Sequence, residues 1–121
     1  MSGFVALDLV IVGVRDLDAA AADYAVLLGR APSWRGEHPG RGTANALFRL
    51  ENTYLELLSA REDGPLGFAL RADDVASCAL ELRARGLDVG EAVAGEGREI
   101  ATGAVRHWKT VGIPGDATRG I

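Results

Sequence analysis

The feature that most constrains the fold is an order of elements that occurs twice along the chain. An apolar run from Val5 to Val14 leads to Asp16, a residue type that caps the start of a helix, and the helical pattern then ends at Gly29. In the second half, a shorter apolar run leads to Asp74, and the helical pattern ends at Gly86. The two aspartates are separated by nearly the same number of residues as the two glycines. This spacing predicts two copies of one strand–helix unit, unless two ordinary capped helices share it by coincidence.

The periodicity of apolar residues predicts the remaining elements. Both helices carry an apolar stripe, at Leu17, Ala20, Ala21, Tyr24, Leu27 and Leu28 in the first and at Val75, Cys78, Ala79 and Leu82 in the second. Strands are predicted at 5–14, 33–35, 43–50, 54–58 and 67–72, and then at 89–93, 99–101 and 104–111. The first strand is so continuously apolar that we expect both of its faces to be covered. These elements predict an α+β fold in a single domain over residues 1–121.

Composition excludes several classes of partner. Thirteen basic against seventeen acidic side chains give a net charge of −4, which argues against nucleic acid and anionic membranes as partners. No apolar stretch approaches the ~18 residues that span a membrane. Cys78 is the only cysteine, so the chain has no internal disulfide and no thiolate metal cluster. A lone cysteine fits a reducing cytoplasm.

Four stretches of the sequence carry a family resemblance. They are Leu7–Leu17, the block His38–Leu47 with Asn52–Leu57, Phe68–Asp74, and the pair Arg106-x-Trp108. They resemble the vicinal oxygen chelate superfamily, and more specifically its glyoxalase-like domain branch. The resemblance implies two βαβββ modules, at about 4–60 and 66–121, that form one curved mixed sheet with a concave cleft. It also implies that the last strand of the second module is missing or truncated, since it would begin near Arg119 and run past Ile121.

The superfamily contains metal-dependent lyases, isomerases and dioxygenases as well as metal-free drug-binding proteins, so the site has to decide between them. In metal-using relatives, a histidine on the first strand of each module and a glutamate on the fourth hold a divalent cation. The resemblance places Leu9 and Gly67 at the two histidine positions, and Glu56 at one glutamate position, while the other falls near Pro114. One carboxylate is too little to hold a transition metal. We therefore expect no metal and no cofactor at this site.

Two residues are candidates for proton transfer. Glu56 shares a strand face with Tyr54 and Leu58, and an apolar pocket would suit it as a general base; the alternative is a solvated glutamate on an edge strand. His38 lies in a glycine-rich loop, where an imidazole can shuttle a proton near neutral pH or simply stabilise the loop by a hydrogen bond. His107 is expected to be exposed.

Other residues are candidates for ligand binding. Asn45 and Arg49 fall on one face of a predicted strand, and an asparagine both donates to and accepts from a polar ligand. Trp34, Tyr54 and Trp108 offer flat apolar surfaces for a planar ligand, although tryptophan more commonly packs in a core. An arginine such as Arg49 attracts an anionic substrate or is merely solvated.

These residues lead to two functional hypotheses. In the first, the chain binds a small organic molecule and catalyses metal-independent lyase or isomerase chemistry, with Glu56 as base, His38 as acid, and Asn45 and Arg49 orienting the ligand. In the second, it is a non-catalytic drug- or metabolite-binding protein that uses its aromatic residues as a platform. In either case we expect a homodimer, because a missing last strand leaves unpaired backbone groups at a sheet edge.

Overall fold

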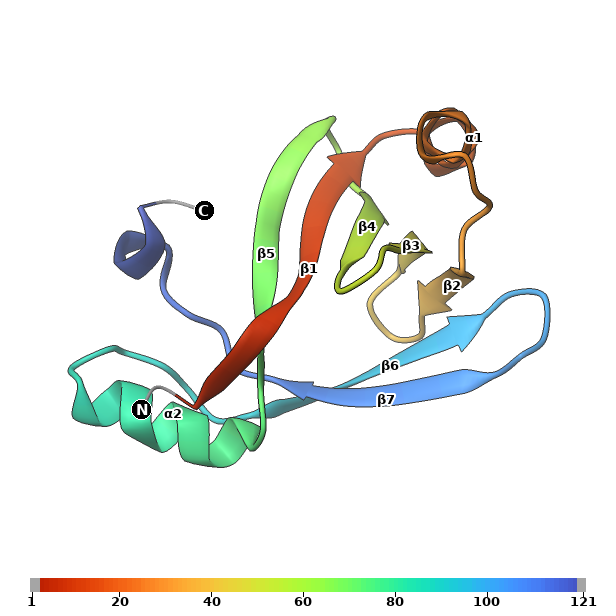
Figure 1. Ribbon diagram of the computed structural model, residues 1–121. Helices are drawn as coiled ribbons and strands as arrows, with labels where there is room; N and C mark the ends of the chain where they lie inside the picture. Colours follow the sequence, from red (N-terminus) through yellow and green to blue (C-terminus); the bar gives the residue numbers. More distant parts are fainter. Residues whose placement is uncertain (1–2, 120–121) are drawn as a thin grey trace.

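One curled mixed sheet and two helices make up the fold in the computed structural model, which describes residues 3–119 (Figure 1). The elements are β1 (Phe4–Val14), α1 (Leu17–Leu28), β2 (Trp34–His38), β3 (Thr43–Arg49), β4 (Tyr54–Ser59), β5 (Gly64–Ala72), α2 (Val75–Ala84), β6 (Val93–Glu99), β7 (Val105–Thr110) and a 3-10 turn (Gly115–Thr118). The strand order is β5-β1-β4-β3-β2-β6-β7, with β1 and β4 parallel and the other neighbours antiparallel. The predicted α+β fold with a curved mixed sheet is confirmed.

Both helices begin at the aspartates that the sequence predicts. The Asp16 carboxylate accepts a hydrogen bond from the backbone N–H of Ala19 at 3.0 Å, and Asp74 caps α2 in the same way. Each carboxylate satisfies an N–H that has no partner within its helix. Gly29 ends α1 at a φ of 67°, and Gly86 lies just beyond α2 at a φ of 94°. Both glycines adopt the left-handed conformation that side chains disfavour, so the helix boundaries follow from local sequence.

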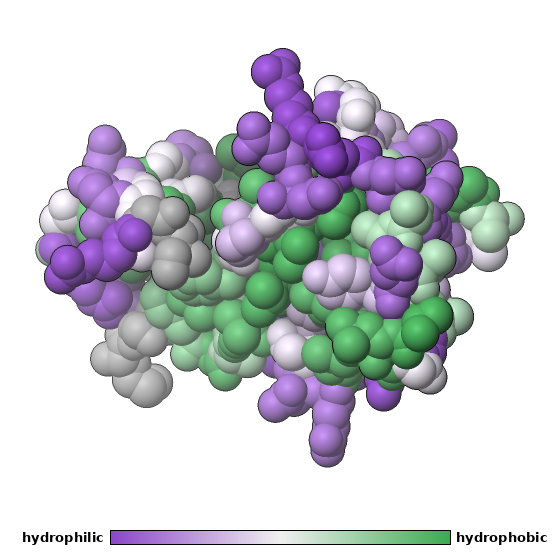
Figure 2. All heavy atoms as spheres, turned by 90° about the horizontal axis from the view of Figure 1, so that it is seen from above, coloured by the Kyte–Doolittle hydropathy of each residue, from purple (hydrophilic) through white to green (hydrophobic). Residues whose placement is uncertain are grey.

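The first strand is less covered than its apolar sequence predicts. Val5, Leu7 and Val10 of β1 are 51%, 42% and 38% exposed, and Phe68 and Leu70 of β5 are 39% and 40% exposed. The reason is that α1 packs against one end of β1 and α2 against the other. The prediction that both faces of this strand are covered is therefore wrong. Figure 2 shows exposed apolar side chains gathered in a broad area on one face of the molecule.

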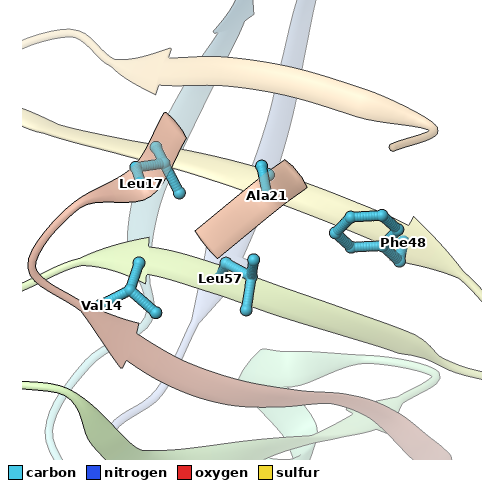
Figure 3. Packing of buried hydrophobic residues seen from close by; sticks show 6 residues of the cluster. Val14, Leu17, Ala21, Phe48 and Leu57 are labelled. Atoms are coloured by element: carbon cyan, nitrogen blue, oxygen red, sulfur yellow. The ribbon is translucent and has the colours of Figure 1, made fainter. Parts of the chain in front are cut away.

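The main core lies between α1 and one face of the sheet (Figure 3). Phe48 of β3 and Leu57 of β4 are 0% exposed and pack there with Val14, Leu17 and Ala21. Side chains alternate along a strand, so every second residue of β3 and β4 points away from this core. These alternate residues lie on the opposite, concave face of the sheet. A smaller core beneath α2 contains Cys78, Ala79, Leu82 and Val89.

One residue of the predicted stripe on α1 does not belong to the core. Leu27 is 73% exposed, although Leu17 and Ala21 are buried and Leu28 packs against the core as predicted. Successive residues of a helix are about 100° apart around its axis. Leu28 lies near the middle of the buried stripe, so Leu27 lies at its edge, toward solvent. The helix presents a narrower apolar face than the sequence pattern indicates. No helix within residues 3–119 is long and apolar enough to cross a membrane.

Strand positions in the second half differ from those predicted. The strands expected at 89–93 and 99–101 are wrong, because β6 spans Val93–Glu99 and Val89 packs under α2 from the connecting loop. After β7, Val111 and Ile113 also pack beneath α2. The described residues contain no eighth strand; residues 120–121, onto which that strand was expected to run, lie outside them. Within the described sheet, β5 and β7 each have one free edge.

Candidate functional site

The curl of the sheet brings the predicted site residues to one face, opposite α1. Residues that share this concave face include Leu9 and Ile11 of β1, Trp34 and His38 of β2, Asn45 and Arg49 of β3, Tyr54 and Glu56 of β4, and Trp108 of β7. The strand register sets their order: Arg49 pairs with Tyr54 at one end, and Thr43 pairs with His38 at the other. All seven residues predicted to act on a ligand therefore lie on the same surface of the sheet.

A buried carboxylate–amide pair occupies the middle of this face. The Asn45 side-chain Nδ2 donates to Oε2 of Glu56 at 2.8 Å, and the two residues are only 4% and 9% exposed. Since β4 lies between β1 and β3, Glu56 is on an interior strand rather than on an edge. The Oδ1 atom of Asn45 is buried and has no hydrogen-bond partner among the described residues. A buried acceptor of this kind is satisfied by a donor from a ligand or a water molecule.

His38 lies at the end of the face near Thr43. Its Nδ1 is 2.7 Å from the Thr43 hydroxyl, and the edge of its ring meets Trp108, with ring centroids 5.8 Å apart and planes at 87°. Burial lowers the pKa of His38; the Glu56 carboxylate partly opposes this shift and Arg41 adds to it. A neutral imidazole whose Nδ1 accepts from Thr43 carries its proton on Nε2, where it can be donated to a ligand.

The lowered pKa of His38 predicts a pH dependence of stability. Above the ordinary value of 6.5 the imidazole is neutral in both states. As the pH falls below 6.5, the unfolded chain takes up the proton first, so the free energy of unfolding decreases until the folded pKa is passed. We expect urea unfolding midpoints to fall between pH 7 and pH 5, and His38→Gln to remove part of that fall. An equal fall in His38→Gln would contradict the prediction, which an NMR titration of the imidazole checks directly.

Each tryptophan lies over a glycine, Trp108 over Gly95 of the neighbouring strand β6 and Trp34 over Gly36 of its own strand β2. A Cβ atom at Gly95 would collide with the Trp108 indole, and one at Gly36 would collide with that of Trp34. Trp34 is 6% exposed, and the Arg106 guanidinium carbon lies 4.2 Å from its ring centroid, a cation–π contact. Trp34 is thus mainly a packing residue beneath Arg106, whereas Trp108 is half-buried and keeps part of its surface open.

Sequence reasoning missed the parts played by Thr43 and Arg106. Thr43 holds the His38 ring, and Arg106 stacks on the concave face. The alternation of Gly95 and Gly97 in β6 marks the close approach of another group, but that group is the Trp108 indole, so no sequence signal pointed to Arg106. The expectation for His107 is confirmed, since this residue is exposed.

Arg49 and Tyr54 form the other end of the face. The Arg49 Nη1 atom donates to the Tyr54 hydroxyl at 2.8 Å, and its guanidinium lies 5.4 Å from the centroid of that ring. Arg49 also lines a surface hollow of about 470 Å³ next to the loop after α1. A second hollow of about 640 Å³ lies between the start of α1 and the start of β5, and no predicted site residue lines it.

The residues present do not fit the divalent cation that the fold family implies. Ile11 pairs with both Glu56 and Gly67, and Leu9 pairs with Tyr54, so the positions that resemble the metal-binding histidines lie on the same part of the sheet as Glu56, one and two strands away from it. They supply no ligand atom, however, and residues 3–119 contain no group of three His, Cys, Asp or Glu side chains that could hold a metal ion. Three or more such ligands are the usual requirement. No metal-dependent step is therefore derived for this site.

Comparison with known proteins supports the fold. Residues 7–120 match the family model described as a glyoxalase-like domain, and no curated protein matches the sequence. A variant of Streptomyces coelicolor methylmalonyl-CoA epimerase in complex with 2-nitronate-propionyl-CoA is similar, with 16% identity, a TM-score of 0.72, and 98% of this chain and 93% of that chain covered. The methylmalonyl-CoA epimerase of Mycobacterium tuberculosis has 20% identity and a TM-score of 0.70, with 98% and 95% covered. A hypothetical protein from Bacillus halodurans has 18% identity and a TM-score of 0.77, with 95% and 88% covered.

Proposed function

Because the chain belongs to the glyoxalase-like domain family of the vicinal oxygen chelate superfamily, we propose that its concave face binds a small carbonyl compound and catalyses a metal-independent, isomerase-type proton transfer. The observation that carries the proposal is the buried Glu56–Asn45 pair, in which a carboxylate is held in place on the ligand-binding face. Structural neighbours that bind CoA esters as epimerases support an acyl compound as the ligand class.

In this proposal Glu56 acts as the base. Its carboxylate takes a proton from the carbon next to the carbonyl group, the C–H electron pair moves into the enolate, and negative charge develops on the carbonyl oxygen. The Nε2–H of His38 donates to that oxygen. Asn45 holds the carboxylate through Nδ2 and accepts a ligand donor at Oδ1, and Arg49 orients the rest of the ligand. Protonation of the same carbon on its opposite face by a water molecule inverts that carbon, and Glu56 then gives its proton to solvent, which completes an epimerisation.

Proton exchange in heavy water tests the proposal whatever the product of the reaction is. The protein is incubated in D₂O with a panel of small acyl-CoA esters and 2-substituted carbonyl compounds, and deuterium at the carbon next to the carbonyl is measured by mass spectrometry. We expect exchange into at least one compound, at a rate that pretreatment with EDTA leaves unchanged. Exchange that EDTA abolishes would contradict the metal-independent mechanism.

A non-catalytic binding protein is the second candidate function. The half-buried Trp108, together with Tyr54, favours it because both present aromatic surface on the concave face. A compound that binds with micromolar affinity but shows no exchange in D₂O would support this function and contradict the catalytic one.

We also propose that the chain forms a homodimer through the β1/β5 strip, defined as Leu7, Val10, Phe68 and Leu70. Leu7 pairs with Leu70 and Val10 with Phe68, so the four exposed side chains are contiguous, and β5 beside them has a free edge. Such a patch and such an edge both favour association.

Light scattering checks the dimer. We expect the mass of a dimer for the wild type and a shift to monomer in Phe68→Asp, which places a charge in the strip. Val26→Asp is the control, because Val26 is 85% exposed on α1 and lies outside the strip. A wild-type monomer at every concentration measured would overturn the proposal.

A further inference from the structure

The hollow of about 470 Å³ at the Arg49 end of the concave face carries two positive charges. It is lined by Arg30, Ala31, Ser33, Arg49, Leu50 and Glu51. Its floor is formed where the loop after α1 meets the end of β3, and Ser33 joins the two by donating to the Leu47 carbonyl and accepting from the Arg49 N–H. The loop is therefore fixed against the strand.

Both guanidinium groups are held in place by a single hydrogen bond each. Arg30 Nη1 donates to the Arg49 carbonyl at 2.8 Å, and Arg49 Nη1 donates to the Tyr54 hydroxyl at 2.8 Å. A guanidinium has five N–H donors, so each group retains several for another acceptor. Within residues 3–119 neither arginine forms an ion pair, and although Glu51 lines the same hollow it pairs with neither. The hollow thus keeps a net positive charge.

We propose that this hollow binds an oxyanion, the phosphate or carboxylate group of a ligand, between Arg30 and Arg49. Two oriented guanidinium groups at the wall of one hollow match the oxygens of such a group, which accept paired N–H donors. Both arginines are exposed, so water satisfies their remaining N–H donors, and an oxyanion would replace that water while also offsetting the positive charge.

The position of the hollow also specifies the substrate class, an inference that rests on the proposed function. Glu56 lies opposite Leu47, and Arg49 lies two residues further along β3, which is about 7 Å in a strand. A ligand whose oxyanion occupies the hollow would place a carbon roughly that far away near the Glu56 carboxylate. The substrate class is therefore an anionic carbonyl compound, such as one that carries a phosphate or a second carboxylate.

Titration with simple anions tests the site independently of any reaction. The ¹⁵N-labelled protein is titrated at low ionic strength with inorganic phosphate in one arm and succinate in the other. We expect saturable shifts of the Ser33, Arg49 and Leu50 amides, and the arm that binds more tightly identifies the group. Arg30→Gln and Arg49→Gln should each weaken binding at least about tenfold, which corresponds to the loss of one charge-assisted contact.

Controls separate specific binding from general attraction. Arg71→Gln removes one charge from an exposed position on β5 and should leave the affinity unchanged. Arg30→Lys keeps the charge but loses the planar fork, and should give an intermediate affinity. Shifts without saturation, or equal weakening by Arg71→Gln, would overturn the proposal. Anion binding that persists in a protein with no D₂O exchange would refute the proposed reaction while leaving the oxyanion site in place.

Discussion

Replacing Glu56 with glutamine should lower the rate of D₂O exchange by two to four orders of magnitude, the usual contribution of a general base. Glutamine has nearly the same shape, and its Oε1 can still accept the hydrogen bond from Asn45 Nδ2 that Glu56 Oε2 accepts at 2.8 Å. The substitution therefore removes the proton acceptor while keeping the buried contact. We expect the ligand dissociation constant to change by less than about tenfold, because the loss falls on the transition state.

Two further variants test whether a loss of the exchange rate in Glu56→Gln is specific to the loss of the base. Glu37→Gln removes a carboxylate from the exposed opposite side of β2 and should leave the exchange rate unchanged. Asn45→Leu leaves the carboxylate in place but removes its hydrogen-bond donor, and should give a smaller loss of rate than Glu56→Gln. An exchange rate in Glu56→Gln within about threefold of wild type would exclude Glu56 as the base.

The first half of the fold could be predicted from the sequence because each signal there is local. Asp16 and Gly29 fix the ends of α1 through backbone hydrogen bonds and a left-handed φ. Alternation along β3 separates Phe48 from Asn45 and so assigns one to the core and the other to the concave face. The second half depends on distant contacts, since Val89 leaves the strand pattern to fill the core beneath α2. Tertiary packing overrides the local pattern at that point.

Part of the candidate site could also be predicted, because some of its signals are local in the sequence. The face that Glu56, Asn45 and Arg49 share follows from strand alternation and the family resemblance. The hydrogen bond between Asn45 and Glu56 depends on the register of β3 with β4, which no short sequence pattern specifies. The hollow depends on Arg30, which reaches it from the loop after α1. Contacts of this kind join segments that are distant in the sequence, so they depend on the tertiary structure and not on a local pattern.

Truncation of Phe48 to alanine should cause the largest loss of stability. Phe48 is 0% exposed between β3 and α1, and its ring centroid lies 6.4 Å from that of Tyr24. Removing a buried phenylalanine costs about 3–5 kcal/mol, from lost apolar burial and from the cavity that remains. A domain of this size is typically stable by about 5–15 kcal/mol, so the urea midpoint should fall steeply.

The same substitution links the core to the site, because Phe48 and the concave residues share β3. Loss of packing on one face of this strand loosens the position of Asn45 on the other, so anion and ligand binding should weaken in parallel with stability. Phe48→Leu keeps most of the side-chain volume and should cost less, while Val26→Ala, at an 85% exposed position of α1, should cost almost nothing. A loss below about 1 kcal/mol in Phe48→Ala would mean that α1 does not pack on β3, and that the assignment of the concave face is wrong.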